Sequence, residues 1–312
     1  MINTKIVERF LTQQINLEEN SIINYRNDIE KFLKHCSQIL SIPIEKENEL
    51  LDNISVDLIE DIFNTYREIY KKKTINRRVA SCNTFGEYLV NRNIWASNKF
   101  SVLLYYNYID DKREYYMPTT NEINAMLSTS EKDNNKLRGY RTCFIISLMA
   151  TTGLRINNVL DLQFNQLEKT KDTYMINFTI QQMKNNKGCR IPLSERVLYY
   201  YNKYIEYRNR LNIKECYKDY IIIGDKGKPL TSNSVARNIR RLGRGLIQSN
   251  NLSNLVNHSF RKYFRTTATE LNCNRDLIYL IGNWSFDKVS SCYVVDGKHL
   301  DKAKLELCNA LL

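Results

Sequence analysis

Four short segments of the chain contain residues whose types and spacing suit chemistry on a phosphate group. The first is Thr152-Gly153-Leu154-Arg155, in which an arginine begins a helix directly after a glycine. The second is Lys184, in a polar turn between two predicted strands. The third is His258-Ser259-Phe260-Arg261, which on a helix places an imidazole and a guanidinium one turn apart on one face. The fourth is Gly282-Asn283-Trp284, followed nine residues later by Tyr293.

These residue types match the needs of phosphoryl transfer. Arg155 and Arg261 would present permanently charged donor forks to the oxygens on which negative charge builds up. The indole of Trp284 can donate one hydrogen bond but no proton, which suits a residue that positions a phosphate oxygen. The alternative is that Trp284 is an aromatic residue of the core. A phenol has a pKa near about 10, so Tyr293 would need guanidinium charge and a proton acceptor to become a nucleophile. His258 is the best candidate for that acceptor, or for a donor to the phosphate.

In this order the segments resemble the catalytic signature of the tyrosine recombinases, also called lambda-integrase-type recombinases: Arg, Lys, His-x-x-Arg, His or Trp, then Tyr. Arg155 lies in the T-G-L-R motif, and the K-N-N-K-G-C-R-I-P-L segment that starts at Lys184 is similar to the family's hairpin-turn motif. Position alone singles out Tyr293 among the chain's 21 tyrosines. Its interval from Trp284 is the Cre-like arrangement, so the His/Trp position is assigned to Trp284 and not to Asn283.

The resemblance implies a site-specific recombinase that cleaves and rejoins DNA through a covalent 3′-phosphotyrosyl bond to Tyr293, for integration, excision or resolution. It implies that Lys184 is the general acid for the departing 5′-hydroxyl, with Lys187 as the alternative in the same turn. The partners it implies are double-stranded DNA and further copies of the chain, assembled as a tetramer on two DNA sites. No metal, cofactor, membrane or small-molecule substrate is expected.

Two positions depart from the family's pattern. Asn158 stands where many members have a carboxylate that braces the site, and Lys262 stands where His is common. Either change could lower activity without abolishing it. Asn158 therefore leaves open a DNA-binding protein that keeps the scaffold but has lost catalysis. A third alternative is an enzyme that cuts through tyrosine without recombining, like a topoisomerase or a hairpin telomere resolvase.

Composition agrees with a polyanionic partner. The 312 residues include 46 Lys and Arg against 34 Asp and Glu, a formal net charge of +12. Phosphate contacts by such a chain would release condensed counterions. The eight cysteines form no C-x-x-C pair, which argues against a zinc ribbon or a disulfide framework and favours a reducing, cytoplasmic location. No signal-peptide core and no run of about 20 apolar residues is present.

The chain is predicted to be mainly α (α+β), because only four prolines and ten glycines are available for turns. Apolar residues recur at spacings of three and four over 18–40, 59–70 and 75–89, which predicts amphipathic helices. We expect a helical core-binding domain over 1–110, a linker over 111–118 and a mostly helical catalytic domain over 119–312. Thr119 and Glu122 predict a capping box that opens the second domain, and Gly153 predicts a left-handed helix end.

Small strands and two basic segments complete the prediction. Residues 174–180 and 189–193 are expected to pair as an antiparallel hairpin. A helix over 234–248 would carry arginines on one side and apolar residues, including Leu246, on the other, as in a groove-facing element. The candidate DNA-binding residues are Lys72, Arg77 and Arg78 in the first domain, and Arg237, Arg240, Arg241 and Arg244 in the second.

The last segment, 299–312, has leucines and an alanine at helical spacing. The family resemblance implies a terminal helix that packs into a neighbouring subunit and couples the active sites of a tetramer. The alternative is a helix that caps its own domain. The sequence favours the first arrangement, since this segment follows the nucleophile and ends the chain.

Overall fold

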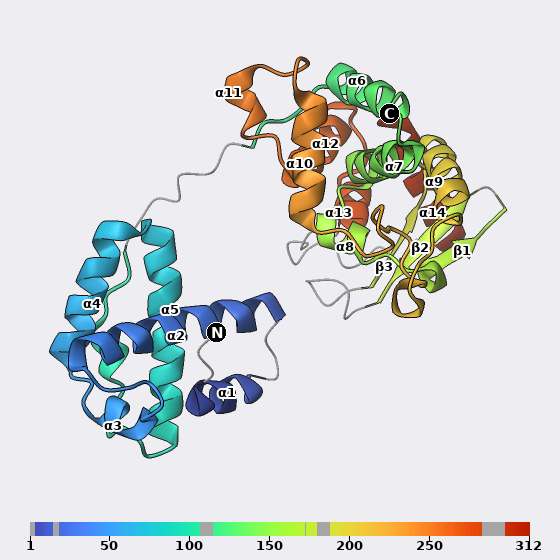
Figure 1. Cartoon of the computed structure of the whole chain (residues 1–312). Coiled ribbons are helices and arrows are strands. Elements are labelled where there is room, and N and C mark those ends of the chain that lie inside the picture. The colour runs from blue at the N-terminus through green and yellow to red at the C-terminus, as the bar shows by residue number, and fades with distance from the viewer. Residues whose placement is uncertain (1–3, 15–18, 107–114, 172, 180–187, 283–296) are drawn as a thin grey trace. The chain divides into compact units, whose positions relative to one another are not determined.

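The structure is a computed structural model that describes residues 4–14, 19–106, 115–171, 173–179, 188–282 and 297–312 (Figure 1). The chain divides into two compact units, Met1–Lys112 and Arg113–Leu312, and each is described by itself. The predicted residues Lys184, Lys187, Trp284 and Tyr293 lie outside the described residues, as do residues 111–114 of the predicted linker.

Five α-helices and one 3-10 helix make up the described part of the first unit. They are α1 (Lys5–Thr12), α2 (Glu19–Leu40), α3 (Glu47–Asp52), α4 (Val56–Ile69), α5 (Lys72–Asn91) and η1 (Lys99–Val102). The three amphipathic helices predicted from spacing are confirmed as α2, α4 and α5, and their apolar stripes meet in one core. Aromatic rings fill its centre, with Phe10 against Phe85 and Phe32 against Phe100 in edge contacts.

A buried carboxylate ties α2 to α5. Asp28 accepts hydrogen bonds from Arg77 and, at 3.0 Å, from the Ser81 hydroxyl, and Arg78 Nε lies 3.6 Å from its second oxygen. The Arg78 guanidinium is buried and lies 4.0 Å from the centroid of the Tyr70 ring. Two of the three basic residues predicted to bind DNA in this unit, Arg77 and Arg78, therefore pair with the same buried carboxylate.

The second unit surrounds one long buried helix. Its elements are α6 (Thr120–Glu131), α7 (Lys136–Thr152), α8 (Ile156–Leu160), η2 (Phe164–Gln166), β1 (Leu167–Lys169), β2 (Tyr174–Phe178), β3 (Cys189–Pro192), α9 (Glu195–Arg208), η4 (Glu215–Tyr217), α10 (Ser232–Gly243), α11 (Ser249–Leu252), α12 (Asn257–Glu270), α13 (Arg275–Gly282) and α14 (Gly297–Ala310). α7 is buried on nearly every side and packs against α6, α9 and α12 (Figure 1). Because it is buried along its length, α7 is the scaffold on which α6, α9 and α12 pack.

The predicted start of α6 and the predicted end of α7 are both confirmed. Thr119 and Glu122 form the capping box at the start of α6. α7 ends at Gly153, whose φ of 61° is the left-handed conformation that glycine adopts without strain.

The sheet is antiparallel in the order β1-β2-β3, with Ile176 opposite Ile191. The two predicted strands are confirmed, whereas the short β1 was missed because three residues show no usable alternation.

The predicted arginine helix is too long. α10 ends at Gly243, and Arg244 has extended backbone angles. Gly245 has a φ of +80°, so the chain turns there, and Leu246 is exposed instead of lying on a buried face. Helical spacing alone did not reveal this end, because Leu246 continues the apolar period by chance.

The terminal helix packs against its own unit, as in the alternative arrangement, and its docking into a neighbouring subunit stays a prediction. α14 lies on β3, and Lys304 Nζ donates a hydrogen bond to the Arg190 carbonyl at 2.7 Å. The Tyr263 hydroxyl donates to the Leu311 carbonyl at 2.8 Å. Leu307 and Leu311 are buried, and this apolar burial holds the helix in place.

Among the residues that the structure describes, no helix combines the length and apolar character needed to span a membrane. The fold class predicted from the sequence, mainly helical with a small antiparallel sheet, is confirmed.

The Asp28 network predicts a large stability effect in the first unit. Asp28→Ala would leave the buried Arg78 without its counter-ion and should lower the free energy of unfolding by about 3 kcal/mol or more. Urea denaturation of the full chain, followed by circular dichroism, measures this change. Glu49→Ala is the control, because it removes only an exposed pair with Lys46 and should cost about 1 kcal/mol at most. Equal effects of the two substitutions would contradict the prediction.

Candidate active site and arginine groove

Three of the predicted catalytic residues, Arg155, His258 and Arg261, come together where α7 ends. Arg155 is the residue that precedes α8, two positions after the left-handed Gly153. Arg261 lies on α12 and donates a hydrogen bond from Nη1 to the Gly153 carbonyl oxygen. This bond fixes one arginine against the turn that carries the other.

His258 lies one helical turn before Arg261 on α12, as predicted. The imidazole is exposed, Arg155 is half-buried, and Arg261 is 4% exposed. Exposure to solvent therefore increases across the cluster, from the buried Arg261 through the half-buried Arg155 to the exposed His258.

The pKa values of this cluster reflect crowded positive charge. Burial, then the charges of Arg155 and Arg265, lower the pKa of Arg261 to about 9. Burial, then the charges of Arg261 and Arg155, also lower the pKa of His258 below its usual range. Like charges held this close favour an anion between them, and a phosphodiester is an anion of suitable shape for two guanidinium groups.

A segment that looked like part of a linker contributes to the site. The Tyr115 ring lies 5.0 Å from the His258 imidazole, centroid to centroid. Lys262 donates from Nζ to the Tyr115 carbonyl at 3.2 Å, and the Tyr116 amide donates to the Asn254 carbonyl at 3.2 Å. Lys262, one of the two departures from the family's pattern, therefore holds this segment beside the histidine. Nothing in the sequence indicated this contact.

Asn257 connects the site to the arginine helix. It is the first residue of α12, and its side-chain amide donates to the Ser232 carbonyl at the start of α10 at 3.1 Å. The beginnings of α10 and α12 are therefore tied together directly before His258. Asn158, where many family members have a carboxylate, is half-buried in the short helix α8.

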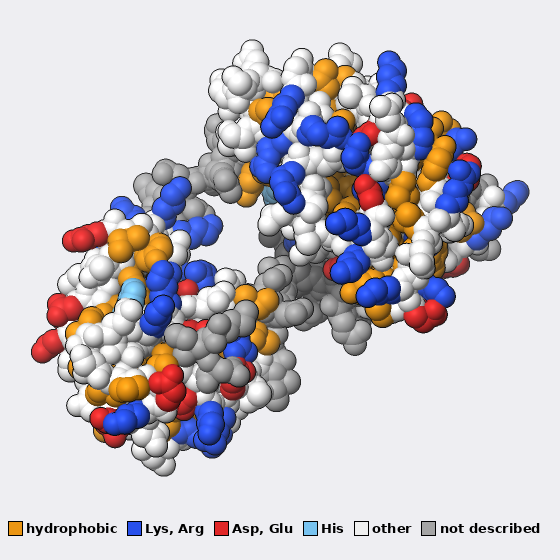
Figure 2. All heavy atoms as spheres, viewed as in Figure 1, with side chains coloured by type: hydrophobic (Ala, Val, Ile, Leu, Met, Phe, Trp, Pro, Cys, Tyr) orange, Lys and Arg blue, Asp and Glu red, His pale blue; other side chains and the backbone are white. Residues whose placement is uncertain are grey.

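The predicted arginines of the second unit line one hollow, which we call the arginine groove. It has a volume of about 520 Å³ between α10 and α11, and its lining is Arg237, Arg240, Arg241, Arg244, Ser249, Leu252 and Ser253. Basic side chains gather over α10 in the view of Figure 2. The predicted apolar side of this helix is confirmed at Val235, Ile239 and Leu242, which are buried. Burial of that side turns the arginines outward.

The basic residues of the first unit differ in access. Lys72 is exposed and lies 5.7 Å from the Tyr106 ring centroid. Arg77 is partly exposed beside Asp28, whereas Arg78 is buried. Lys72 and Arg77 can therefore reach a ligand in solution, and Arg78 supports Asp28 from inside.

The site and fold agree with the comparisons to known proteins. Residues 118–298 match the phage integrase family, and residues 7–93 match the phage integrase N-terminal SAM-like domain. The chain belongs to the phage integrase family. It is a tyrosine recombinase, an enzyme that breaks and rejoins DNA strands through a tyrosine.

Individual relatives agree with this placement. The chain is 24% identical over 263 residues to tyrosine recombinase XerD of Staphylococcus aureus, which covers 84% of this chain and 83% of that protein. Its fold is similar to XerH recombinase bound to its difH substrate, with a TM-score of 0.66 and 16% identity over 98% of this chain and 82% of that one. It is also similar to the Tn1549 transposon integrase in complex with circular intermediate DNA, with a TM-score of 0.61 and 17% identity over 91% and 92% of the two chains.

The electrostatics of the cluster predict a shift in the pKa of His258 on binding an anion. In the free protein the pKa should lie below the ordinary value of about 6.5, and a bound phosphodiester should raise it by favouring the imidazolium. NMR titration of the imidazole signals, with and without DNA, measures both values. His258→Gln identifies the signal among the three histidines.

Arg155→Gln provides the matched control for this titration. It removes one neighbouring positive charge and should raise the pKa of His258 in the free protein. A pKa at or above the ordinary value in the wild-type free protein would contradict this account of the site.

Proposed function

We propose that the protein is a site-specific recombinase in which Tyr293 attacks a DNA phosphodiester, forming a 3′-phosphotyrosyl bond and releasing a 5′-hydroxyl. The 5′-hydroxyl of another strand then attacks this ester, so strands are exchanged without an external energy source. One observation carries the proposal: residues from two separate motifs, Arg155, His258 and Arg261, converge into one cationic cluster.

Within the cluster each residue has a role that follows from its position. Arg155 and Arg261 bind the non-bridging oxygens and stabilise the charge that develops on them. The Gly153 carbonyl orients Arg261, so this charge is in place before DNA binds. His258 is exposed and its pKa is lowered, so near neutral pH it is a neutral imidazole that can accept the phenol proton of Tyr293.

The motif match assigns the remaining roles. Lys184 protonates the departing 5′-hydroxyl, and Lys187 is the alternative in the same segment. Trp284 donates its indole N–H to a phosphate oxygen at the position usually held by His, as in the Cre-like arrangement. These three residues and Tyr293 lie outside the described part of the structure, so their roles rest on sequence position.

DNA binding is divided between the two parts of the chain. Residues 1–110 act as the core-binding domain through Lys72 and Arg77, with Arg78 acting through Asp28. Residues 111–118 are the linker, and 119–312 are the catalytic domain, whose arginine groove contacts the phosphate backbone. The +12 formal charge supports a strongly salt-dependent affinity.

The assembly and location follow from the same reaction. Exchange between two duplexes requires four strand cleavages, so we infer a tetramer on two DNA sites. We infer a cytoplasmic location, and the seven cysteines among the described residues, all free thiols, support a reducing environment. Integration, excision and resolution of circles share this chemistry, and the choice among them depends on the DNA sites.

The test of the proposal is covalent trapping on a nicked duplex. The DNA carries the protein's own binding sequence, obtained by selection from random duplexes, and a nick next to the cleavage point lets the short 5′-hydroxyl fragment diffuse away. We expect a protein–DNA adduct on a denaturing gel with the wild type and none with Tyr293→Phe. Sequence-specific binding without any adduct would instead favour a catalytically silent DNA-binding protein.

The cluster itself yields a second prediction with the same assay. Arg261→Gln should reduce the rate of adduct formation about 100-fold or more, because it removes a preorganised donor from the transition state. Its DNA affinity in a gel-shift assay should change far less. Arg210→Gln removes an exposed arginine paired with Glu206 and should leave both quantities unchanged. A parallel loss of binding and cleavage in Arg261→Gln would argue against a catalytic role.

A further inference from the structure

Asp133 is an acidic residue placed beside the arginine groove. It lies in the loop between α6 and α7, and its side chain is 8% exposed. It accepts hydrogen bonds from Arg138 at 2.9 and 2.7 Å and from the Asn135 backbone N–H at 3.0 Å. Hydrogen bonding to Arg138 is the main reason that the pKa of Asp133 falls to about 2. The carboxylate is therefore a permanent anion at any pH at which the protein binds DNA.

The same carboxylate reaches α10. Arg241 Nη2 lies 3.3 Å from Asp133 Oδ2. Arg241 also donates to Asn238 Oδ1 at 3.1 and 2.9 Å, and the Asn238 amide donates to the Thr142 hydroxyl on α7 at 2.7 Å. Arg241 is thus drawn toward α7 and the acidic loop, although it belongs to the arginine groove.

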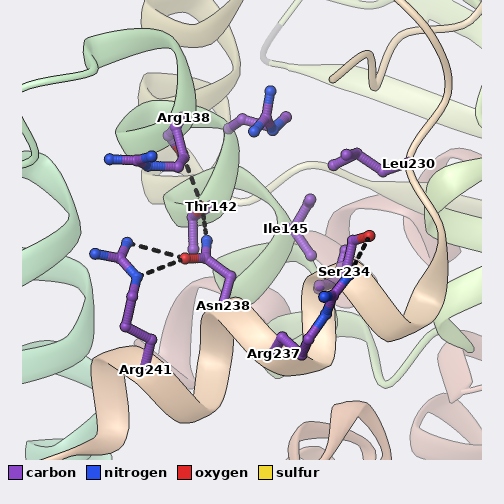
Figure 3. Close-up of a pocket in the computed structure, with 10 residues that line it drawn as sticks. Arg138, Thr142, Ile145, Leu230, Ser234, Arg237, Asn238 and Arg241 are labelled. Atoms are coloured by element: carbon purple, nitrogen blue, oxygen red, sulfur yellow. Dashed lines mark hydrogen bonds between the residues drawn. The ribbon is translucent and has the colours of Figure 1, made fainter. Parts of the chain in front are cut away.

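Arg237 and Arg241 both line a pocket of about 310 Å³ between α7 and α10, but their side chains point in different directions (Figure 3). Arg241 turns toward Asn238 (Figure 3). Arg237, one turn earlier on α10, turns instead toward Ser234, which it contacts at 3.5 Å (Figure 3). Both side chains are exposed and both line the groove. They differ in that Asp133 lies beside Arg241.

This difference bears on how tightly the groove holds DNA of any sequence. Phosphate contacts supply affinity without information about sequence, so an enzyme that must find one site gains from limiting them. The Arg241 side chain is 50% exposed and makes a single bond to Asp133, so a phosphate can compete for it. Each phosphate that does so must displace the carboxylate or share the guanidinium with it.

We propose that Asp133 is a specificity-determining residue, whose carboxylate offsets the charge of Arg241 and so weakens sequence-independent binding by the arginine groove. This inference rests on the proposed function, because it assumes that the groove binds the DNA backbone.

Asp133→Asn tests the proposal, since asparagine keeps the shape and can still accept from the Asn135 amide. Affinity for a random duplex should rise about three- to tenfold at low salt, and the salt dependence should steepen by about one phosphate contact. The ratio of affinities for selected and random duplexes should fall. Fluorescence anisotropy across a salt series, with the full chain, measures all three quantities.

Asp225→Asn is the matched control. It makes the same change in net charge at the same end of α7, but its carboxylate pairs with Arg141 at 2.8 Å and not with α10. We expect little change in affinity or in salt dependence. An increase equal to that of Asp133→Asn would overturn the proposal, because net charge alone would then explain the result.

A double-mutant cycle tests whether the effect passes through Arg241. In an Arg241→Gln background, Asp133→Asn should no longer change the affinity for random DNA. If Asp133→Asn fails to fold, the two arginines can be compared in the wild-type background. Arg237→Gln should then reduce the salt dependence by about one contact and Arg241→Gln by less. Equal losses would overturn the proposal.

The wild type separates this inference from the function on which it rests. A wild-type chain with no salt-dependent affinity for duplex DNA would overturn both the proposed function and the inference. A wild type that binds as expected, with Asp133→Asn unchanged from it, would overturn the inference alone.

Discussion

The hydrogen bond from Arg261 to the Gly153 carbonyl is the interaction on which the site depends. Two guanidinium groups repel each other, and the chain must hold them together beside the imidazole without a phosphate present. The bond contributes to this by anchoring the buried Arg261 side chain to the backbone at the end of α7. Burial, and after it the charges of Arg155 and Arg265, lower the pKa of Arg261, so the protonated guanidinium is held there at an electrostatic cost. A phosphodiester that enters the cluster relieves that cost.

The rest of the second unit serves to fix this bond. α7 is buried along its length and ends at Gly153, and α12, which packs on α7, carries Arg261. The packing of these two helices therefore sets the positions of the two residues that the bond joins. Asn257 then ties α12 to α10. The elements that would hold the DNA and the elements that would cut it therefore share one scaffold. A movement of α10 on binding would reach His258 through a short path of covalent and hydrogen bonds.

The sequence predicted the features that depend on local patterns. The capping box, the left-handed Gly153, the amphipathic helices and the His258–Arg261 spacing each arise from residues close in the chain. The features that it missed depend on residues that meet only after folding. Asp133 meets Arg241 across 108 positions, and Tyr115 meets His258 across more than a hundred. The end of α10 was mispredicted because Leu246 continues the apolar period beyond the turn at Gly245.

The most direct test of the central claim is to identify the residue that carries the DNA. The trapped adduct would be digested with a protease and a nuclease, and the modified peptide sequenced by mass spectrometry. The account predicts a nucleotide joined through its 3′-phosphate to Tyr293. Attachment to another tyrosine, such as Tyr115 beside His258, or attachment through a 5′-phosphate, would contradict it.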